Sequence, residues 1–210
     1  MVLDFWFVRG VLEQKMNIQL QPLVMLTLTE PGQAAGKILT LKWPRQVLWT
    51  GLILAIALNA IVYSFQELVF PLPSDLGLPK LSPLTYFGVM LAIQVVFVFA
   101  LFAMGRWLGG QGSLEDLLVL VVWLQLLQVA LQIIMTLLFL VAPLLAGLLN
   151  LAATLFGLYI FANFINEAHR LGSLWRAFGV LLMASIAIAL VLSFILGLAG
   201  PSLLGLSANV

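Results

Sequence analysis

The fifty residues LLVLVVWLQLLQVALQIIMTLLFLVAPLLAGLLNLAATLFGLYIFANFIN, from Leu117 to Asn166, contain no charged side chain and decide the fold. A single helix of that length would extend for about 75 Å, whereas the hydrocarbon of a bilayer is about 30 Å thick. The stretch must therefore turn back once. Pro143 is the strongest break within it, because proline donates no backbone hydrogen bond and disfavours a helical conformation at the preceding residue. The stretch predicts a tight hairpin of two membrane-spanning helices.

The composition of the whole chain is that of an integral membrane protein. Of its 210 residues, 63% are hydrophobic and 8% are charged, against about 25% charged in soluble domains. The net charge of +1 gives no general attraction to nucleic acid, so we expect no nucleic-acid partner. The absence of cysteine excludes disulfides, thiolate metal sites and cysteine nucleophiles. We therefore expect the lipid bilayer to be the main partner, and we expect no cofactor.

Residues 1–42 mix apolar and charged side chains and predict an N-terminal segment distinct from the spans. Residues 1–9 lack the basic region and cleavage site of a signal peptide, so we expect the spans themselves to direct membrane insertion. Pro31 suits the first turn of a helix, with Glu30 near the positive end of its dipole. This amphipathic helix, residues 33–41, is expected to lie in the headgroup region; a solvated lead-in is the alternative. Its apolar face would hold Ala34, Ala35, Ile38 and Leu39.

Residues 43–199 predict an all-α bundle of five transmembrane helices, followed by a short uncharged tail at residues 200–210. The hairpin supplies the third and fourth spans. The other three are expected at about residues 47–65, 84–104 and 173–198.

The connections between the spans carry their own signals. Residues 66–82 contain three prolines and are expected to form an irregular loop. Ser82 ahead of Pro83 predicts a capped start for the second span. Residues 105–112 are rich in glycine and are expected to form a flexible connector. Ser113, three residues before Asp116, then predicts a capping box at the start of the third span.

Five spans put the two termini on opposite sides of the membrane, and the basic residues indicate which side is which. With the N-terminus inside, the inner segments hold eight of the nine basic residues, namely Arg9, Lys15, Lys37, Lys42, Arg45, Arg106, Arg170 and Arg176. Only Lys80 would lie outside. Because cytoplasmic loops are enriched in Lys and Arg, we expect a cytoplasmic N-terminus and an external C-terminus in a cell membrane, the inner membrane in a bacterium.

Three glutamines share one face of the third span, at positions i, i+3 and i+7: Gln125, Gln128 and Gln132. An amide in hydrocarbon needs a hydrogen-bond partner, so this face should meet protein or a hydrated cleft. The fourth span completes the candidate polar face with Asn150 and Asn163; Asn59 and Gln94 on the first two spans are further partners to consider. We expect hydrogen bonding between helices; the alternative is a polar pathway for a solute or lipid headgroup. No charged residue lies deep in a predicted span, which argues against an ion-coupled pump.

A second candidate site is a cytoplasmic cluster at the open end of the hairpin. Its members are Glu115 and Asp116 at the start of the third span and Glu167 and His169 at the end of the fourth. One histidine and three carboxylates are suitable for a metal site or for acid–base chemistry. Their spacing matches no known motif, so we expect a solvated interfacial cluster that caps helices.

The fifth span carries small residues at intervals of four: Ser185, Ala189, Ser193 and Gly197. Such a helix-packing stripe lets another helix approach closely. We expect the approaching helix to belong to the same chain, with a second copy as the alternative.

Several short motifs together resemble the bacterial branch of the Yip family, the Ypt/Rab-interacting membrane proteins. These are Leu-Thr-Glu-Pro-Gly-Gln-Ala-Ala at residues 28–35, Trp-Pro-Arg at residues 43–45 and Gly-Gln-Gly-Ser-Leu-Glu-Asp-Leu at residues 110–117. The resemblance covers about residues 23–198. It implies a five-span domain with a cytosolic N-terminus. Eukaryotic members carry an Asp-Leu-Tyr-Gly-Pro motif and act with small GTPases in vesicle traffic; this chain has no such motif.

The sequence therefore predicts a non-enzymatic membrane scaffold or membrane organiser, with other membrane proteins or further copies of the chain as partners. The alternative is a small transporter, channel or lipid-handling protein that uses the polar faces of the third and fourth spans. A membrane enzyme ranks third, because no nucleophile–base pair or metal motif is visible.

Overall fold

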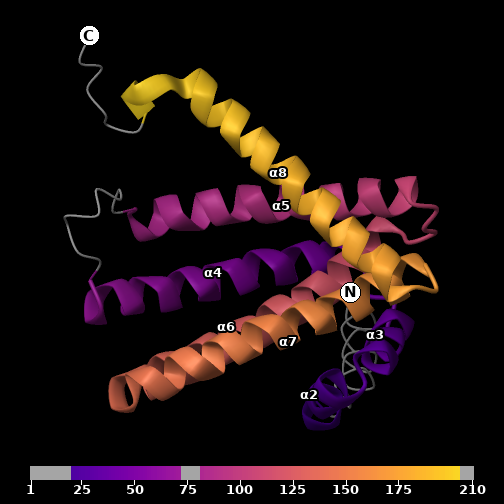
Figure 1. Cartoon of the computed structure of the whole chain (residues 1–210), viewed down its shortest axis with the longest axis horizontal. Coiled ribbons are helices and arrows are strands. Elements are labelled where there is room, and N and C mark those ends of the chain that lie inside the picture. Colours follow the sequence, from indigo (N-terminus) through magenta and orange to yellow (C-terminus); the bar gives the residue numbers. More distant parts are fainter. Residues whose placement is uncertain (1–19, 72–80, 204–210) are drawn as a thin grey trace, which may run out of the picture.

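The computed structural model describes residues 20–71 and 81–203, with side chains up to residue 194 (Figure 1). The helices in these ranges are α2 (Leu20–Thr29), α3 (Pro31–Thr40), α4 (Arg45–Val69), α5 (Pro83–Trp107), α6 (Leu114–Val141), α7 (Pro143–His169) and α8 (Leu174–Leu203). The described residues form no strand. Five helices, α4 to α8, are long and apolar enough to cross a membrane. The predicted all-α fold with five spans is confirmed.

The predicted hairpin is formed by α6 and α7, which are separated by a single non-helical residue. Ala142 has φ −143° and ψ 76°, and Pro143 occupies the first turn of α7. Because proline clashes with a helical conformation at the residue before it, Ala142 is forced out of the helix and the chain reverses there. The predicted hairpin, with its turn at Pro143, is therefore present in the structure.

Three span boundaries differ from the prediction. The second span continues to Trp107, so that residues 105–107, expected in the flexible connector, form its last helical turn. The first span continues to Val69, so that Gln66 and Glu67 are helical rather than part of a loop. The helix ends only at Phe70 because this residue precedes Pro71 and has φ −128°. The rest of the predicted loop, residues 72–80, lies outside the described residues. At the other end of the chain, α8 extends to Leu203, past the predicted start of the tail.

The five long helices pack most closely at one end of the bundle. There α4, α6 and α8 begin and α5 and α7 end, and α8 crosses α5 before it diverges from the other helices (Figure 1). The largest fully buried side chains gather mainly toward this end and include Leu101, Leu117, Leu118, Phe164 and Val180. The six described Lys and Arg residues, of nine in the chain, also belong to helix termini and links at this end. We call it the basic end; its members are Lys37, Lys42, Arg45, Arg106, Arg170 and Arg176.

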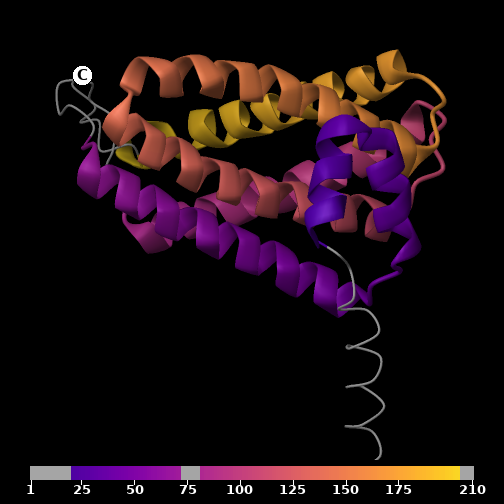
Figure 2. The same ribbon diagram turned by 90° about the horizontal axis from the view of Figure 1, so that it is seen from below.

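The two short helices α2 and α3 form a helical pair that lies against the outside of the bundle near the basic end (Figure 2). The apolar face of α3 is buried, with Ala34 and Ala35 at 0% exposure and Ile38 at 2%. Its neighbour is mainly α7: a Cβ on Gly32 would lie 3.9 Å from Asn163 Oδ1, and one on Gly36 would lie 3.6 Å from Glu167 Oε1. Protein rather than lipid therefore covers the apolar face of α3.

Candidate functional site

The predicted cytoplasmic cluster lies where the start of α6 meets the end of α7. The backbone N–H of Gln111 donates a hydrogen bond of 2.8 Å to the carbonyl of His169. Ser113 and Asp116 form the predicted capping box: the Asp116 N–H donates to Ser113 Oγ, and the Ser113 N–H donates to Asp116 Oδ2, each at 3.0 Å. The two ends of the hairpin therefore return to the same level.

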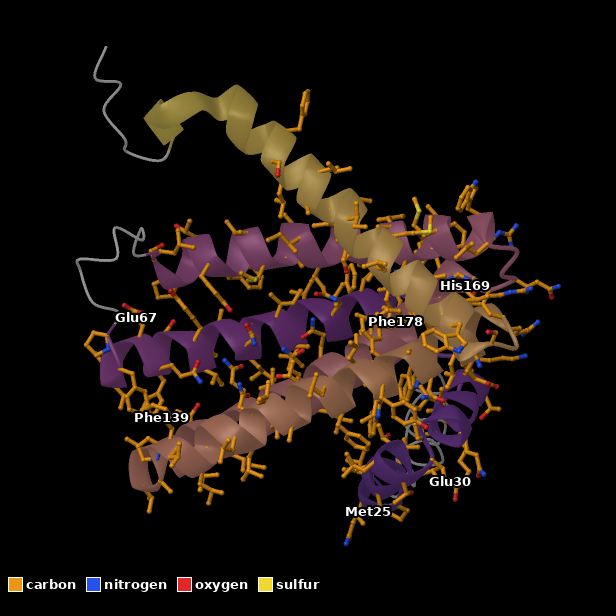
Figure 3. The ribbon with its side chains drawn as sticks, viewed as in Figure 1. Met25, Glu30, Glu67, Phe139, His169 and Phe178 are labelled. Atoms are coloured by element: carbon orange, nitrogen blue, oxygen red, sulfur yellow. The ribbon has the colours of Figure 1, made fainter. Side chains whose placement is uncertain are left out.

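His169 occupies the centre of this region and is completely buried, at 0% exposure (Figure 3). Its Nε2 lies 3.2 Å from the carbonyl oxygen of Leu101 on α5. Because a carbonyl can only accept, Nε2 carries the proton in this contact. Nδ1 has no hydrogen-bond partner among the described residues. The prediction of a solvated histidine is wrong, because the α5–α6 link folds over the imidazole and excludes water.

Three glycines make this burial possible. A Cβ on Gly105 would overlap the imidazole of His169, and a Cβ on Gly110 or Gly112 would lie 2.8 Å from Nδ1. Only backbone without side chains can approach the ring this closely. Gly109, at φ +85°, makes the turn between them. The segment predicted to be a flexible connector is therefore a close-packed cover, and it leaves no room for a substrate at the imidazole.

The acidic members of the cluster do not converge on His169 as ligands. Asp116 is occupied by the capping box, and Glu167 is exposed on α7 beside α3. Glu115 Oε1 lies 3.9 Å from Arg45 Nε, with the Arg45 side chain 62% exposed and the Glu115 side chain 46% exposed. Within the described ranges, no three His, Asp or Glu side chains are arranged to hold a metal ion.

A polar network inside the bundle joins α4, α5 and α6, and Gln132 is its central member. Asn59 Nδ2 donates to Gln132 Oε1 at 2.9 Å, and Gln132 Nε2 donates to Gln66 Oε1 at 2.9 Å. Gln66 Nε2 in turn donates to Thr136 Oγ1 at 2.6 Å. The Tyr86 hydroxyl donates to Asn59 Oδ1 at 3.0 Å. Both polar ends of the Gln132 amide are thus paired inside the protein, as an amide in hydrocarbon requires.

Sequence reasoning identified Gln132 and Asn59 but missed Gln66, Tyr86 and Thr136. The missing signal was periodicity: Asn59 and Gln66 are seven residues apart on α4, and Gln132 and Thr136 are four apart on α6. Ending the first span at residue 65 placed Gln66 in a loop and hid this match. The ring of Tyr86 also stacks on Tyr63 of α4 at 3.8 Å, which seats its hydroxyl against Asn59.

The other members of the predicted polar face lie apart from this network. Gln125 is half-buried, Gln128 and Asn150 are exposed, and Asn163 donates to the carbonyl of Tyr159 within α7. Of these five side chains, only the Gln132 amide forms hydrogen bonds with another described helix. A polar pathway along α6 and α7 stays a prediction.

The small-residue stripe of α8 faces outward over its described part. Ser185, Ala189 and Ser193 are exposed in the single chain, and the side-chain surroundings of Gly197 lie outside the described residues. The stripe stays a prediction. Close approach through small residues does occur elsewhere, where Gly32 and Gly36 of α3 lie on α7.

A hydrogen bond fastens α2 to the bundle. Trp123 Nε1 on α6 donates to Thr27 Oγ1 at 3.1 Å, and the buried Thr27 hydroxyl donates to the Leu23 carbonyl at 2.8 Å. The opposite side of α2 is exposed although it is apolar: Met25 is 56% exposed and Leu28 45%. Figure 3 shows Met25 on the side of α2 turned away from the bundle. These two faces could not be told apart from the sequence, because α2 is apolar on both.

Comparison with known proteins supports one assignment. No curated protein and no solved structure matches the chain. The model of the Yip1 domain family matches residues 25–196, which extend from α2 into α8 and include the cover over His169 and the polar network. This match spans most of the chain. The protein belongs to the Yip1 domain family and is a multi-pass membrane protein.

Proposed function

We propose that this protein is a non-enzymatic membrane scaffold that organises the bilayer through its α2–α3 pair. The observation that carries the proposal is the outer side of α2, where Met25 and Leu28 are exposed on a helix whose inner side is packed. Apolar side chains at that density on a helix surface call for contact with lipid. The outer side of α2 therefore lies among the acyl chains and headgroups of one leaflet.

The length of α2 makes its effect on the bilayer asymmetric. Ten residues of helix extend for about 15 Å, roughly half of the hydrocarbon thickness. Such a helix occupies volume in one leaflet and leaves the other unchanged. The apolar face of α3 is buried against α7, and Trp123 donates a hydrogen bond to Thr27 of α2. These contacts hold α2 at a fixed position beside the spans.

The orientation is part of this proposal. The basic end faces the cytoplasm, since Lys and Arg are enriched in cytoplasmic loops, and the protein belongs to the inner membrane of a bacterium. The leaflet that α2 occupies is then the cytoplasmic one. Partners are other membrane proteins or further copies of the chain, which would dock on the exposed sides of α7 and α8. The transporter interpretation is not favoured, because the network amides bond to one another rather than line an open path.

The test is reconstitution into vesicles of phosphatidylglycerol and phosphatidylethanolamine, with vesicle diameter measured by electron cryomicroscopy. The parent protein should shift the population toward smaller or tubular vesicles as the protein-to-lipid ratio rises. A double variant, Met25→Gln with Leu28→Gln, should lose this effect while keeping the fold, because both side chains are exposed.

The matched control carries the same chemistry at the opposite end of the bundle. Leu68 and Leu84 are 81% and 78% exposed, and the double variant Leu68→Gln with Leu84→Gln should deform vesicles like the parent. Parent vesicles indistinguishable from protein-free ones would refute the proposal. Equal loss of deformation in both double variants would also refute it, because the effect would then not depend on α2.

A further inference from the structure

An apolar groove of about 210 Å³ lies between the α2–α3 pair and the first turns of the spans. Its walls come from four helices and from the link between α3 and α4, and they include Leu23, Ile38, Trp43, Val47, Val119 and Trp123. No charged side chain lines it. The groove begins at the link between α3 and α4, beside the basic end, and extends along α6 as far as Leu126. It therefore leads from the surface level of the bundle toward the hydrocarbon.

The polar atoms near the groove are turned away from it or already paired. The indole N–H of Trp123 bonds to Thr27, and the Thr27 hydroxyl bonds to the Leu23 carbonyl. At Gly51, α4 and α6 approach so closely that a Cβ would lie 3.0 Å from Val122 Cγ1, so this contact closes the groove between the two helices. A ligand inside would meet hydrocarbon alone, which suits an acyl chain and no polar molecule.

Positive charge flanks the upper end of the groove. Lys42 lies between Leu41 and Trp43 in the chain, and both of these neighbours line the groove. Arg45 is the first residue of α4 and precedes the lining residue Val47 by two positions. Lys42 and Arg45 are both exposed, and Glu115 lies only loosely, at 3.9 Å, from the Arg45 guanidinium. Two cations beside an apolar channel complement an anionic headgroup above an acyl chain.

We propose that this groove binds one acyl chain of an anionic membrane phospholipid, with its phosphate held by Lys42 and Arg45. The site is separate from the outer side of α2, because Met25 and Leu28 are not part of its lining. The inference can therefore fail while the proposed effect on membrane shape holds, and the reverse is also true.

The experiment measures lipid association with the purified full-length protein in nanodiscs, using spin-labelled phosphatidylglycerol and phosphatidylcholine. The parent should prefer phosphatidylglycerol by about fivefold for each basic side chain that contacts the phosphate. Lys42→Gln with Arg45→Gln should remove this preference and leave phosphatidylcholine association unchanged. The charge control, Arg106→Gln with Arg176→Gln, changes two cations of the same end away from the groove and should keep the preference.

A second set of variants fills the groove. Val119→Trp should abolish the immobilised component of both lipids, whereas Ile134→Trp on the same helix, at a site 59% exposed, should leave it unchanged. Leu126→Trp is a second filling variant at a site 39% exposed and therefore tolerant of a larger side chain. Both filling variants should behave alike.

Three results would overturn the inference. The first is equal association of the two lipids with the parent, and the second is lipid immobilisation that survives both filling variants. The third concerns residues 2–19, which precede Leu20 at the groove. If the variant without these residues immobilises lipid and the parent does not, the chain's own N-terminal residues occupy the groove. If both proteins immobilise lipid equally, the result supports lipid as the occupant.

Discussion

At the residue scale, His169 is completely buried and has backbone packed directly against its ring. Its imidazole is enclosed by the backbone of Gly105, Gly110 and Gly112, and its Nε2–H is bonded across to α5. The sequence allowed a prediction that these residues meet, because the hairpin returns to its starting level. It did not allow a prediction of burial, since glycines that make room for a neighbour look the same as glycines that make a loop flexible.

The first prediction concerns Gly105→Ala. The added methyl group would overlap His169, and we expect a loss of stability of about 1–3 kcal/mol, as at other overpacked sites. The measurement is thermal unfolding in detergent. Gly88→Ala on the same helix is the control, because a Cβ there has nothing within 4 Å and alanine favours helix by about 0.5–1 kcal/mol. Equal melting of the two variants would show that the imidazole can move aside.

The second prediction concerns Gln132→Leu. Leucine would leave Asn59 Nδ2 and Gln66 Oε1 without their partner, and we expect a cost of about 0.6–1.7 kcal/mol, the range of hydrogen bonds between membrane helices. Unfolding by denaturing detergent measures it. Gln128→Leu, one turn earlier and exposed, should be neutral or slightly stabilising. A larger loss of stability for Gln128→Leu than for Gln132→Leu would contradict this prediction. It would indicate that the predicted polar face, rather than the network around Gln132, stabilises the bundle.

At the element scale, the spans followed from the sequence because length and the absence of charge are sufficient to identify a membrane helix. Caps at Ser82 and Ser113 and the break before Pro143 were equally readable, since each depends on a few neighbouring residues. The docking of α3 was not predictable. An apolar face such as that of Ala34 and Ala35 satisfies protein and lipid alike, and only the tertiary fold decides between them.

The third prediction tests that docking. Ala35 is fully buried, so Ala35→Leu should push α3 away from α7 at a cost of about 1–3 kcal/mol. Amide hydrogen exchange should then rise across α3, while the spans keep their protection. Lys37→Leu, at an exposed position of the same helix, should leave exchange unchanged. If exchange in α3 is equally fast in the parent and in Ala35→Leu, the helix is not held against α7 in the membrane.

At the scale of the whole molecule, the described basic residues lie at the end of the bundle where the helices pack most closely. The described basic residues, the capping box and the cover over His169 all lie at one end, and α8 diverges toward the other (Figure 1). The sequence predicted the charge asymmetry, because counting Lys and Arg by segment requires only the span boundaries. It could not predict that the α8 stripe is exposed in the single chain, since small residues at intervals of four do not identify their partner.

The fourth prediction is the orientation of the bundle. With five spans, a reporter fused after Val210 should lie outside the cell membrane, and one inserted at Gly172 should lie in the cytoplasm. Gly172 is the suitable internal site, because it is exposed and a Cβ there meets nothing within 4 Å, whereas an insertion at Gly110 would displace the cover over His169. The side of each position is measured with two reporter proteins, one active only in the cytoplasm and one active only outside the membrane. A cytoplasmic reporter at both positions would contradict the five-span count, and the reverse assignment at both would place α2 in the outer leaflet.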